Sequence, residues 1–101
     1  MKVYISGPIT NKDPEVQAAN IAKFYVAEEK LLAEGYTVCN PNKLDHSKCE
    51  SKWYKYMKVA LIGMLLCDGI YMLDGHRNST GACIEYALSK TLSYIEVKNE
   101  I

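Results

Sequence analysis

The sequence predicts an α/β fold in which a three-layer, doubly wound parallel sheet of four or five strands carries helices on both faces. Short apolar segments alternate along the chain with longer segments of helical period. Turn, cap and stop residues separate these segments. The 101 residues contain no internal repeat, low-complexity segment or linker, so we expect a single domain over residues 1–101.

The first half of the chain predicts a strand at residues 2–6, a helix at 14–33 and a second strand at 36–40. Asp13 is a favoured N-cap, and Pro14 suits the first helical position. The apolar residues that then recur at helical spacing are Ile21, Phe24, Ala27 and Leu31. Gly35 can adopt the left-handed conformation that ends a helix.

The second half predicts a loop at residues 42–52, a helix at 53–66, a strand at 69–73, a helix at 80–90 and a last strand at 92–97. The loop is polar and has no period, and loops of this length are often functional. The residues expected on the buried face of the first of these helices are Met57, Leu61, Met64 and Leu65.

Alternating strands and helices indicate a parallel sheet, and a strand order of 2-1-3-4 makes the fold flavodoxin- or Rossmann-like. The winding then reverses between the first and third strands, and ligands bind at the carboxyl ends of strands at such a reversal. The loops after these two strands should therefore meet. The binding residues expected there are Ser6, Gly7, Pro8, Asp74, Gly75, Ser79 and Gly81.

Glu85 is the leading candidate for chemistry. It lies one helical turn after Gly81, on the same face of the predicted helix. Because Gly81 has no side chain, we expect the space above Glu85 to be open to a ligand. A carboxylate that faces a small polar pocket at a strand-to-helix turn is typical of an active site. The alternative is a glutamate in solvent that interacts favourably with the helix dipole.

Several other candidates also have a structural interpretation. Ser79 can cap the helix and still bind a ligand. Asp68 either bonds backbone groups at the end of a helix or contacts substrate. Asp74 either holds a sugar hydroxyl or forms a turn with Gly75. Tyr4 is either a core residue with a satisfied hydroxyl or part of the site.

Three further features are ambiguous. His76 is either an acid for a leaving group or a solvated loop residue. Trp53 and Tyr54 are either stacking surfaces over the pocket or the start of an amphipathic helix. Asp45-His46-x-x-Cys49 lacks a second ligand pair at zinc spacing, so we expect no metal site.

Composition limits the partners. Twelve basic and twelve acidic residues cancel, which favours a small-molecule ligand over a nucleic-acid polymer or a membrane surface. The longest apolar run, residues 59–67, is too short to span a bilayer. No signal peptide is evident, and none of the four cysteines forms a Cys-x-x-Cys pair. We therefore expect reduced thiols and a cytoplasmic location.

These motifs together give the chain a family resemblance that covers nearly all of it. The matching segments are Val3-Tyr4-Ile5-Ser6-Gly7-Pro8-Ile9-Thr10, Asn40-Pro41, Trp53, Tyr56-Met57, Cys67-Asp68, Ile70-Tyr71, Ser79-x-Gly81-Ala82-x-x-Glu85 and Ala87. The chain resembles the DUF4406 proteins, which are similar to nucleoside 2-deoxyribosyltransferases and to 2′-deoxynucleoside 5′-phosphate N-hydrolases. The resemblance implies cleavage of an N-glycosidic bond, without a metal or a redox cofactor.

The resemblance also implies roles for individual residues. Glu85 matches the nucleophile that attacks the anomeric carbon of a deoxyribosyl group. Tyr4 matches a tyrosine near that nucleophile. Gly7 matches a turn where backbone approaches the ligand, and Ser79 matches a serine that contacts a 5′-phosphate. Related enzymes build each site from two subunits, which implies a homodimer or a higher homo-oligomer.

Two positions depart from the pattern. Ala60 stands where the superfamily usually carries an aspartate that helps to hold the sugar or the leaving group. Thr10 stands where the N-hydrolases carry a phosphate-binding arginine. We therefore expect N-glycosidic bond cleavage or deoxyribosyl transfer on a small nucleoside or nucleotide, with a non-catalytic nucleotide-binding module as the alternative.

Overall fold

The computed structural model describes residues 1–99, and the last two residues of the predicted domain lie outside this range. The strands are β1 (Lys2–Ser6), β2 (Thr37–Cys39), β3 (Gly69–Met72) and β4 (Ile95–Val97). The α-helices are α1 (Pro14–Ala33), α2 (Trp53–Leu65) and α3 (Thr80–Thr91). Two short 3₁₀ helices, η1 (Pro41–Lys43) and η2 (His76–Asn78), lie between them.

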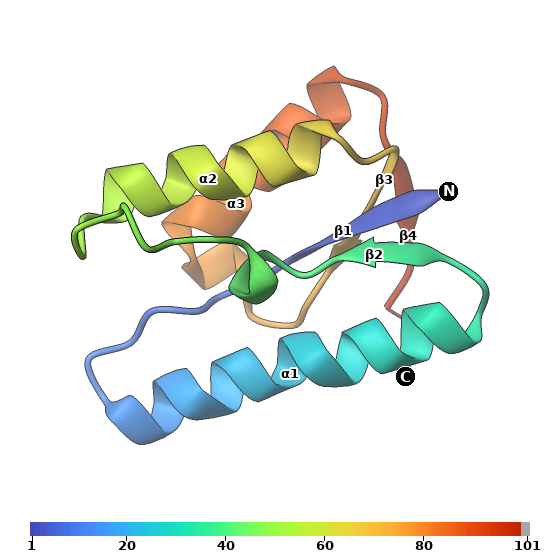
Figure 1. Ribbon diagram of the computed structural model, residues 1–101. Coiled ribbons are helices and arrows are strands. Elements are labelled where there is room, and N and C mark those ends of the chain that lie inside the picture. Colours follow the sequence, from blue (N-terminus) through green and yellow to red (C-terminus); the bar gives the residue numbers. More distant parts are fainter. Residues whose placement is uncertain (100–101) are drawn as a thin grey trace.

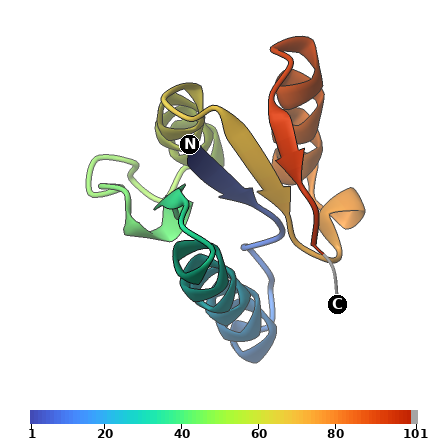
Figure 2. The ribbon, with the colours of Figure 1, turned by 90° about the vertical axis from the view of Figure 1, so that its right-hand side faces the viewer.

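The four strands form one parallel sheet in the order β2-β1-β3-β4. Helix α1 covers one face of the sheet, and α2 and α3 cover the other (Figures 1 and 2). The predicted fold class, strand order and three layers are therefore confirmed. The reversal lies between β1 and β3, where Ser6 pairs with Met72 at the carboxyl ends of both strands.

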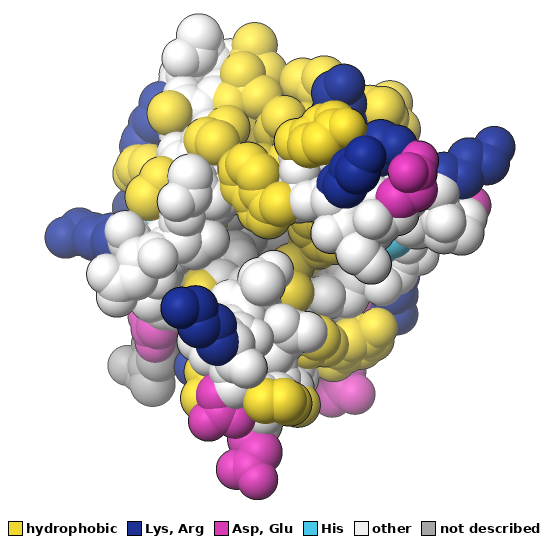
Figure 3. Space-filling view, turned by 90° about the vertical axis from the view of Figure 1, so that its left-hand side faces the viewer, with side chains coloured by type: hydrophobic (Ala, Val, Ile, Leu, Met, Phe, Trp, Pro, Cys, Tyr) yellow, Lys and Arg dark blue, Asp and Glu magenta, His cyan; other side chains and the backbone are white. Residues whose placement is uncertain are grey.

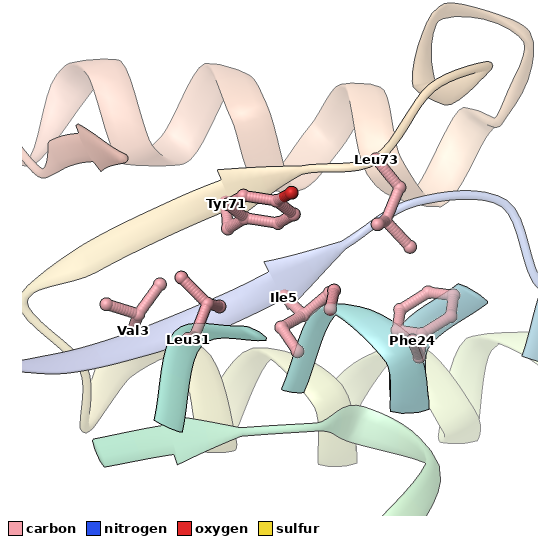
Figure 4. Close-up of a cluster of buried hydrophobic side chains, with 7 residues drawn as sticks. Val3, Ile5, Phe24, Leu31, Tyr71 and Leu73 are labelled. Atoms are coloured by element: carbon pink, nitrogen blue, oxygen red, sulfur yellow. The ribbon is translucent and has the colours of Figure 1, made fainter. Parts of the chain in front are cut away.

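Side chains alternate along β1, so this central strand serves both layers. The core between the sheet and α1 comprises Val3, Ile5, Phe24, Ala27, Leu31, Tyr71 and Leu73 (Figure 4). The core on the opposite face comprises Tyr4, Cys39, Met64, Cys67, Ile70, Met72 and Ala82. Because Ser6 follows Tyr4 by two residues, both side chains face the layer of α2 and α3.

The predicted elements all exist, and the differences lie at their ends and on one helix face. Both β2 and β4 contain only three residues, so the predicted strands at 36–40 and 92–97 are too long. Leu65, expected in the core, is 55% exposed. The small residues Ala60 and Gly63 are buried instead, and Gly63 lets α2 pack closely against Leu44 and Cys39. A Cβ at Gly63 would lie only 2.8 Å from Leu44 Cδ1.

Helix α1 begins and ends where the sequence indicates. Asp13 is its N-cap and accepts a hydrogen bond from the Glu15 N–H at 2.9 Å. Gly35, just beyond its end, has φ +93°, in the left-handed region. Within residues 1–99 no helix is both long and apolar enough to cross a membrane.

The cap gives a first prediction. Asp13→Ala removes the acceptor for the Glu15 N–H and should lower the free energy of unfolding by about 1 kcal/mol. Asp13→Asn keeps an acceptor and should stay within a few tenths of a kcal/mol of the unmodified protein. Urea denaturation measures both. Equal losses in the two variants would contradict the assignment of the cap.

Candidate active site

Glu85 lies at the centre of the site, on the buried face of α3, and only 5% of it is exposed. The Tyr4 hydroxyl donates to its Oε2 at 2.5 Å, and the Ser6 hydroxyl donates to its Oε1 at 2.6 Å. The period of two along β1 delivers both hydroxyls to the same face of the sheet. The carboxylate is thus held at both oxygens, and the alternative of a solvated Glu85 is excluded.

The charges and burial of Tyr4, Ser6 and Glu85 favour an arrangement in which the two hydroxyls keep their protons and donate hydrogen bonds to the carboxylate. Burial raises the pKa of Glu85, and although the hydrogen bonds from Ser6 and Tyr4 lower it, the net direction is upward. Burial and the Glu85 carboxylate together raise the pKa of Tyr4 well above its usual range. Tyr4 therefore keeps its proton at neutral pH. Hydrogen bonds to a charged acceptor are strong, and the two hydroxyls partly offset the desolvation of the carboxylate.

A cleft of about 630 Å³ opens at Glu85, within the usual range for small-molecule sites. Figure 3 shows the face that contains the carboxyl ends of the strands, with a hollow at its centre and hydrophobic side chains gathered along one side. The predicted residues that line the cleft are Tyr4, Gly7, Pro8, Asp74, Gly75, Ser79, Gly81 and Glu85. Ser6 lies behind them and contacts Glu85.

The loops that follow β1 and β3 meet, as the strand order predicts. The Leu73 N–H donates to the Ser6 carbonyl at 2.8 Å. A Cβ at Gly7 would lie 2.8 Å from Leu73 Cβ, so only glycine lets the two exits pass at this distance. Gly75 has φ +84°, and a Cβ there would be 3.7 Å from Pro8 Cγ. Gly7 and Gly75 therefore shape the floor of the cleft through their backbone.

Gly81 has a more limited effect than the sequence suggests. It lines the cleft, but a Cβ at this position would lie 3.0 Å from Met57 Sδ and 3.7 Å from Trp53 Cζ2. Helix α2 therefore fills part of the space expected for a ligand. Ser79 accepts a hydrogen bond from the Ala82 N–H at 3.2 Å. It caps α3 and lines the cleft at once.

The two candidate aspartates beside β3 lie at opposite ends of the strand. Asp74 follows β3 and lines the cleft together with Gly75. Asp68 precedes β3, where its N–H donates to the Lys2 carbonyl at 2.9 Å and its carbonyl accepts from the Ile95 N–H at 3.2 Å. It joins β1 to β4 at the amino ends of the strands. Asp68 thus lies at the opposite end of β3 from the cleft, and it is not among the residues that line the cleft.

The sequence does not predict the wall that α1 contributes. Val16, Asn20 and Lys23 line the cleft from this helix. Asn20 Nδ2 donates to the Ile9 carbonyl at 3.3 Å, which ties α1 to the segment after β1. The available signal is Asn20 itself, a polar residue four positions before Phe24 on the buried stripe. Its side chain bonds the segment that follows β1.

Helix α2 supplies the aromatic wall. Trp53 begins α2 and also lines the cleft, where its stacking on a ligand stays a prediction. Tyr56 lines the cleft one turn later. Tyr54 is exposed and lies outside the lining. His76 also lies outside it, with Nδ1 2.9 Å from the Leu73 carbonyl.

His46 supports this aromatic wall. Its ring stacks on Tyr56 with centroids 4.2 Å apart, and its Nε2 lies 2.7 Å from the Pro41 carbonyl. No group of three His, Cys, Asp or Glu residues that could hold a metal occurs within residues 1–99. Cys39, Cys49, Cys67 and Cys83 are free cysteines.

The fold and the site define a class: α/β proteins with a hydroxyl-bound carboxylate buried where the winding of a parallel sheet reverses. The chain belongs to the DUF4406 family, described as a domain of unknown function, and the match covers residues 1–97. A solved 2-deoxyribosyltransferase from the psychrotolerant bacterium Bacillus psychrosaccharolyticus has a similar structure, with a TM-score of 0.70 and 22% sequence identity. The similarity covers 100% of this chain and 76% of that chain. No curated protein sequence matches the chain. The predicted family and the 2-deoxyribosyltransferase-like fold are thus confirmed.

The raised pKa of Glu85 gives a second prediction. The folded state favours the protonated acid, so this contribution to stability is present at low pH and is lost as pH rises through the folded pKa. Glu85→Gln has no charge to bury. Its free energy of unfolding, measured with urea, should increase relative to the unmodified protein as pH rises above about 4.

The matched control is Glu29→Gln, which alters an exposed glutamate on α1. It should retain the pH dependence of the unmodified protein. A constant stability difference between the Glu85→Gln variant and the unmodified protein at all pH values would contradict the raised pKa.

Proposed function

We propose that this protein cleaves the N-glycosidic bond of a small nucleoside or nucleotide, by hydrolysis or by deoxyribosyl transfer, with Glu85 as the nucleophile. The observation that carries the proposal is the carboxylate of Glu85, held by Tyr4 and Ser6 at the wall of a cleft large enough for a nucleoside. The known fold of a 2-deoxyribosyltransferase supports it.

The reaction has two steps. An oxygen of Glu85 bonds to the anomeric carbon of the sugar while the bond to the base breaks, and the base leaves with the bonding electrons. The base takes a proton from solvent or from a neighbouring group. Water, or the nitrogen of a second base, then attacks the glycosyl ester; the ester bond breaks to regenerate the carboxylate, and the proton lost by the attacking group goes to solvent. The anionic carboxylate also stabilises the positive charge that develops on the sugar.

Tyr4 and Ser6 position the nucleophile for this step. Each carboxylate oxygen has two lone pairs, and each hydroxyl occupies one, so an oxygen can still attack. The two bonds fix the rotation of the carboxylate about its own axis. The partial desolvation that raises the pKa of Glu85 also makes the ionised form a less solvated and more reactive nucleophile.

A non-catalytic nucleotide-binding module is the second candidate. Ala60 favours it, because the resemblance to the deoxyribosyltransferase-like proteins implies an aspartate at this position. Ala60 is 1% exposed, on the buried face of α2. Such a module would bind a nucleotide in the same cleft and leave it intact.

The third prediction separates the two candidates. The purified protein, incubated with a panel of deoxynucleosides and deoxynucleotides, should release free base, detected by chromatography. Glu85→Gln should reduce the rate by roughly 10³-fold or more, because it removes the nucleophile. Glu29→Gln should leave the rate unchanged.

Failure of the unmodified protein to release base from any member of the panel would reject the catalytic proposal. Equal release by the Glu85→Gln variant would reject the role of Glu85. Tight calorimetric binding of an intact nucleotide would instead support the binding module.

We also propose that the protein self-associates through the outer face of α2, where Ile62 is 63% and Leu66 70% exposed. Leu65 is also exposed on this helix, and exposed apolar groups of this kind mark interaction surfaces.

The fourth prediction follows. Sedimentation at micromolar concentration should show a dimer or a larger assembly, and Ile62→Asp together with Leu66→Asp should shift it to monomer. A monomer before substitution would contradict self-association.

A further inference from the structure

Among residues 1–99, the Tyr56 hydroxyl is the one buried side-chain polar atom without a hydrogen-bond partner. Native proteins pair nearly all such groups, and an unpaired one destabilises the folded state. The neighbouring hydroxyls of Tyr4, Ser6 and Ser79 all have protein partners. The unpaired hydroxyl of Tyr56 therefore requires an explanation.

The position of the Tyr56 ring does not depend on its hydroxyl. Helix α2 places the ring in the wall of the cleft, next to Met57 and one turn after Trp53. His46 stacks on it with an interplanar angle of 17°. Close contact of His46 with the Pro41 carbonyl fixes the stack in turn. The ring is thus held by packing, and the hydroxyl does not contribute to holding it in place.

The hydroxyl is a donor that remains available beside the carboxylate. Burial first, and then the charge of Glu85, raise the pKa of Tyr56, so it keeps its proton at neutral pH. The Glu85 oxygens already accept from Tyr4 and Ser6. Tyr56 makes no hydrogen bond to Glu85, although both residues line the same cleft.

We propose that Tyr56 recognises the sugar of the bound ligand and donates a hydrogen bond to one of its hydroxyl groups. This inference rests on the proposed function, in which the anomeric carbon lies against Glu85. The sugar is then the part of the ligand that borders the carboxylate, and Tyr56 lines the same cleft. The Tyr56 hydroxyl has no protein partner to give up when it donates to the ligand.

The fifth prediction tests this pairing by changing protein and ligand together. Tyr56→Phe is combined with Glu85→Gln, which prevents turnover, and is compared with Glu85→Gln alone. Calorimetry measures binding of the best-bound common 2′-deoxynucleoside and of its analogues that lack the 3′- or the 5′-hydroxyl. The matched control is Tyr54→Phe, on the same helix but outside the cleft.

Tyr56→Phe should weaken binding of the intact nucleoside roughly tenfold, and this effect should vanish for one of the two analogues. Without ligand, the same substitution should raise the melting temperature by a few degrees, since it removes an unpaired hydroxyl. Tyr54→Phe should change neither quantity.

Unchanged affinity in Tyr56→Phe, or an equal loss for all three ligands, would overturn the inference. Absence of any nucleoside binding would overturn it together with the proposed function. Binding without release of base by the unmodified protein would reject only the catalytic proposal, and the Tyr56→Phe comparison would then support or overturn the role of Tyr56 by the same outcomes.

Discussion

The hydrogen bonds from Tyr4 and Ser6 to the buried carboxylate of Glu85 are the interaction on which the site depends. A carboxylate removed from water is strongly disfavoured unless donors surround it. Here desolvation outweighs the two bonds, because the net direction of the Glu85 pKa is upward. The charged form of Glu85 therefore destabilises the folded state, and the apolar layers on both faces of the sheet must offset it. A residue with a purely structural role would gain nothing from this arrangement, since an apolar side chain would pack there without the desolvation cost.

The geometry of Tyr4, Ser6 and Glu85 follows from the period of two along β1, the helical period of α3 and the central position of β1 in the sheet. The period of two along β1 sends Val3 and Ile5 to one core and the two hydroxyls to the other face. Helix α3 packs on that second face and buries Ala82 and Glu85 from adjacent turns. Because β1 is central and pairs with both β2 and β3, its carboxyl end opens where the winding reverses. The same strand thus builds the core and delivers the donors to the site.

The sequence predicts those parts of the molecule that local patterns determine, namely the strand order, the caps of α1 and α3, and the convergence of two loops around Glu85. It fails where the outcome depends on how separate elements pack. The space above Gly81 is partly filled by Met57, which no spacing within α3 reveals. Asp68 is a polar residue next to an apolar strand, but it lies before β3 and so at the wrong end of the sheet. The wall from α1 depends on how far this helix extends past the sheet, and only Asn20 within the apolar stripe hints at it.

Two buried polar groups, Glu85 and the Tyr56 hydroxyl, are not fully compensated by hydrogen bonds for their loss of water, and both lie at the cleft. Glu85 retains a net desolvation penalty, and the Tyr56 hydroxyl has no partner. Buried polar groups elsewhere in the described chain are satisfied: Asn40 bonds Glu28 and Asn42, and Ser89 donates to the Tyr86 carbonyl at 2.6 Å. Natural sequences tolerate such imbalances mainly at functional sites, where a ligand can supply the missing interactions. The concentration of both groups in one cleft therefore favours a binding site over a vestigial hollow. It does so from energetics alone, independently of the resemblance to any enzyme.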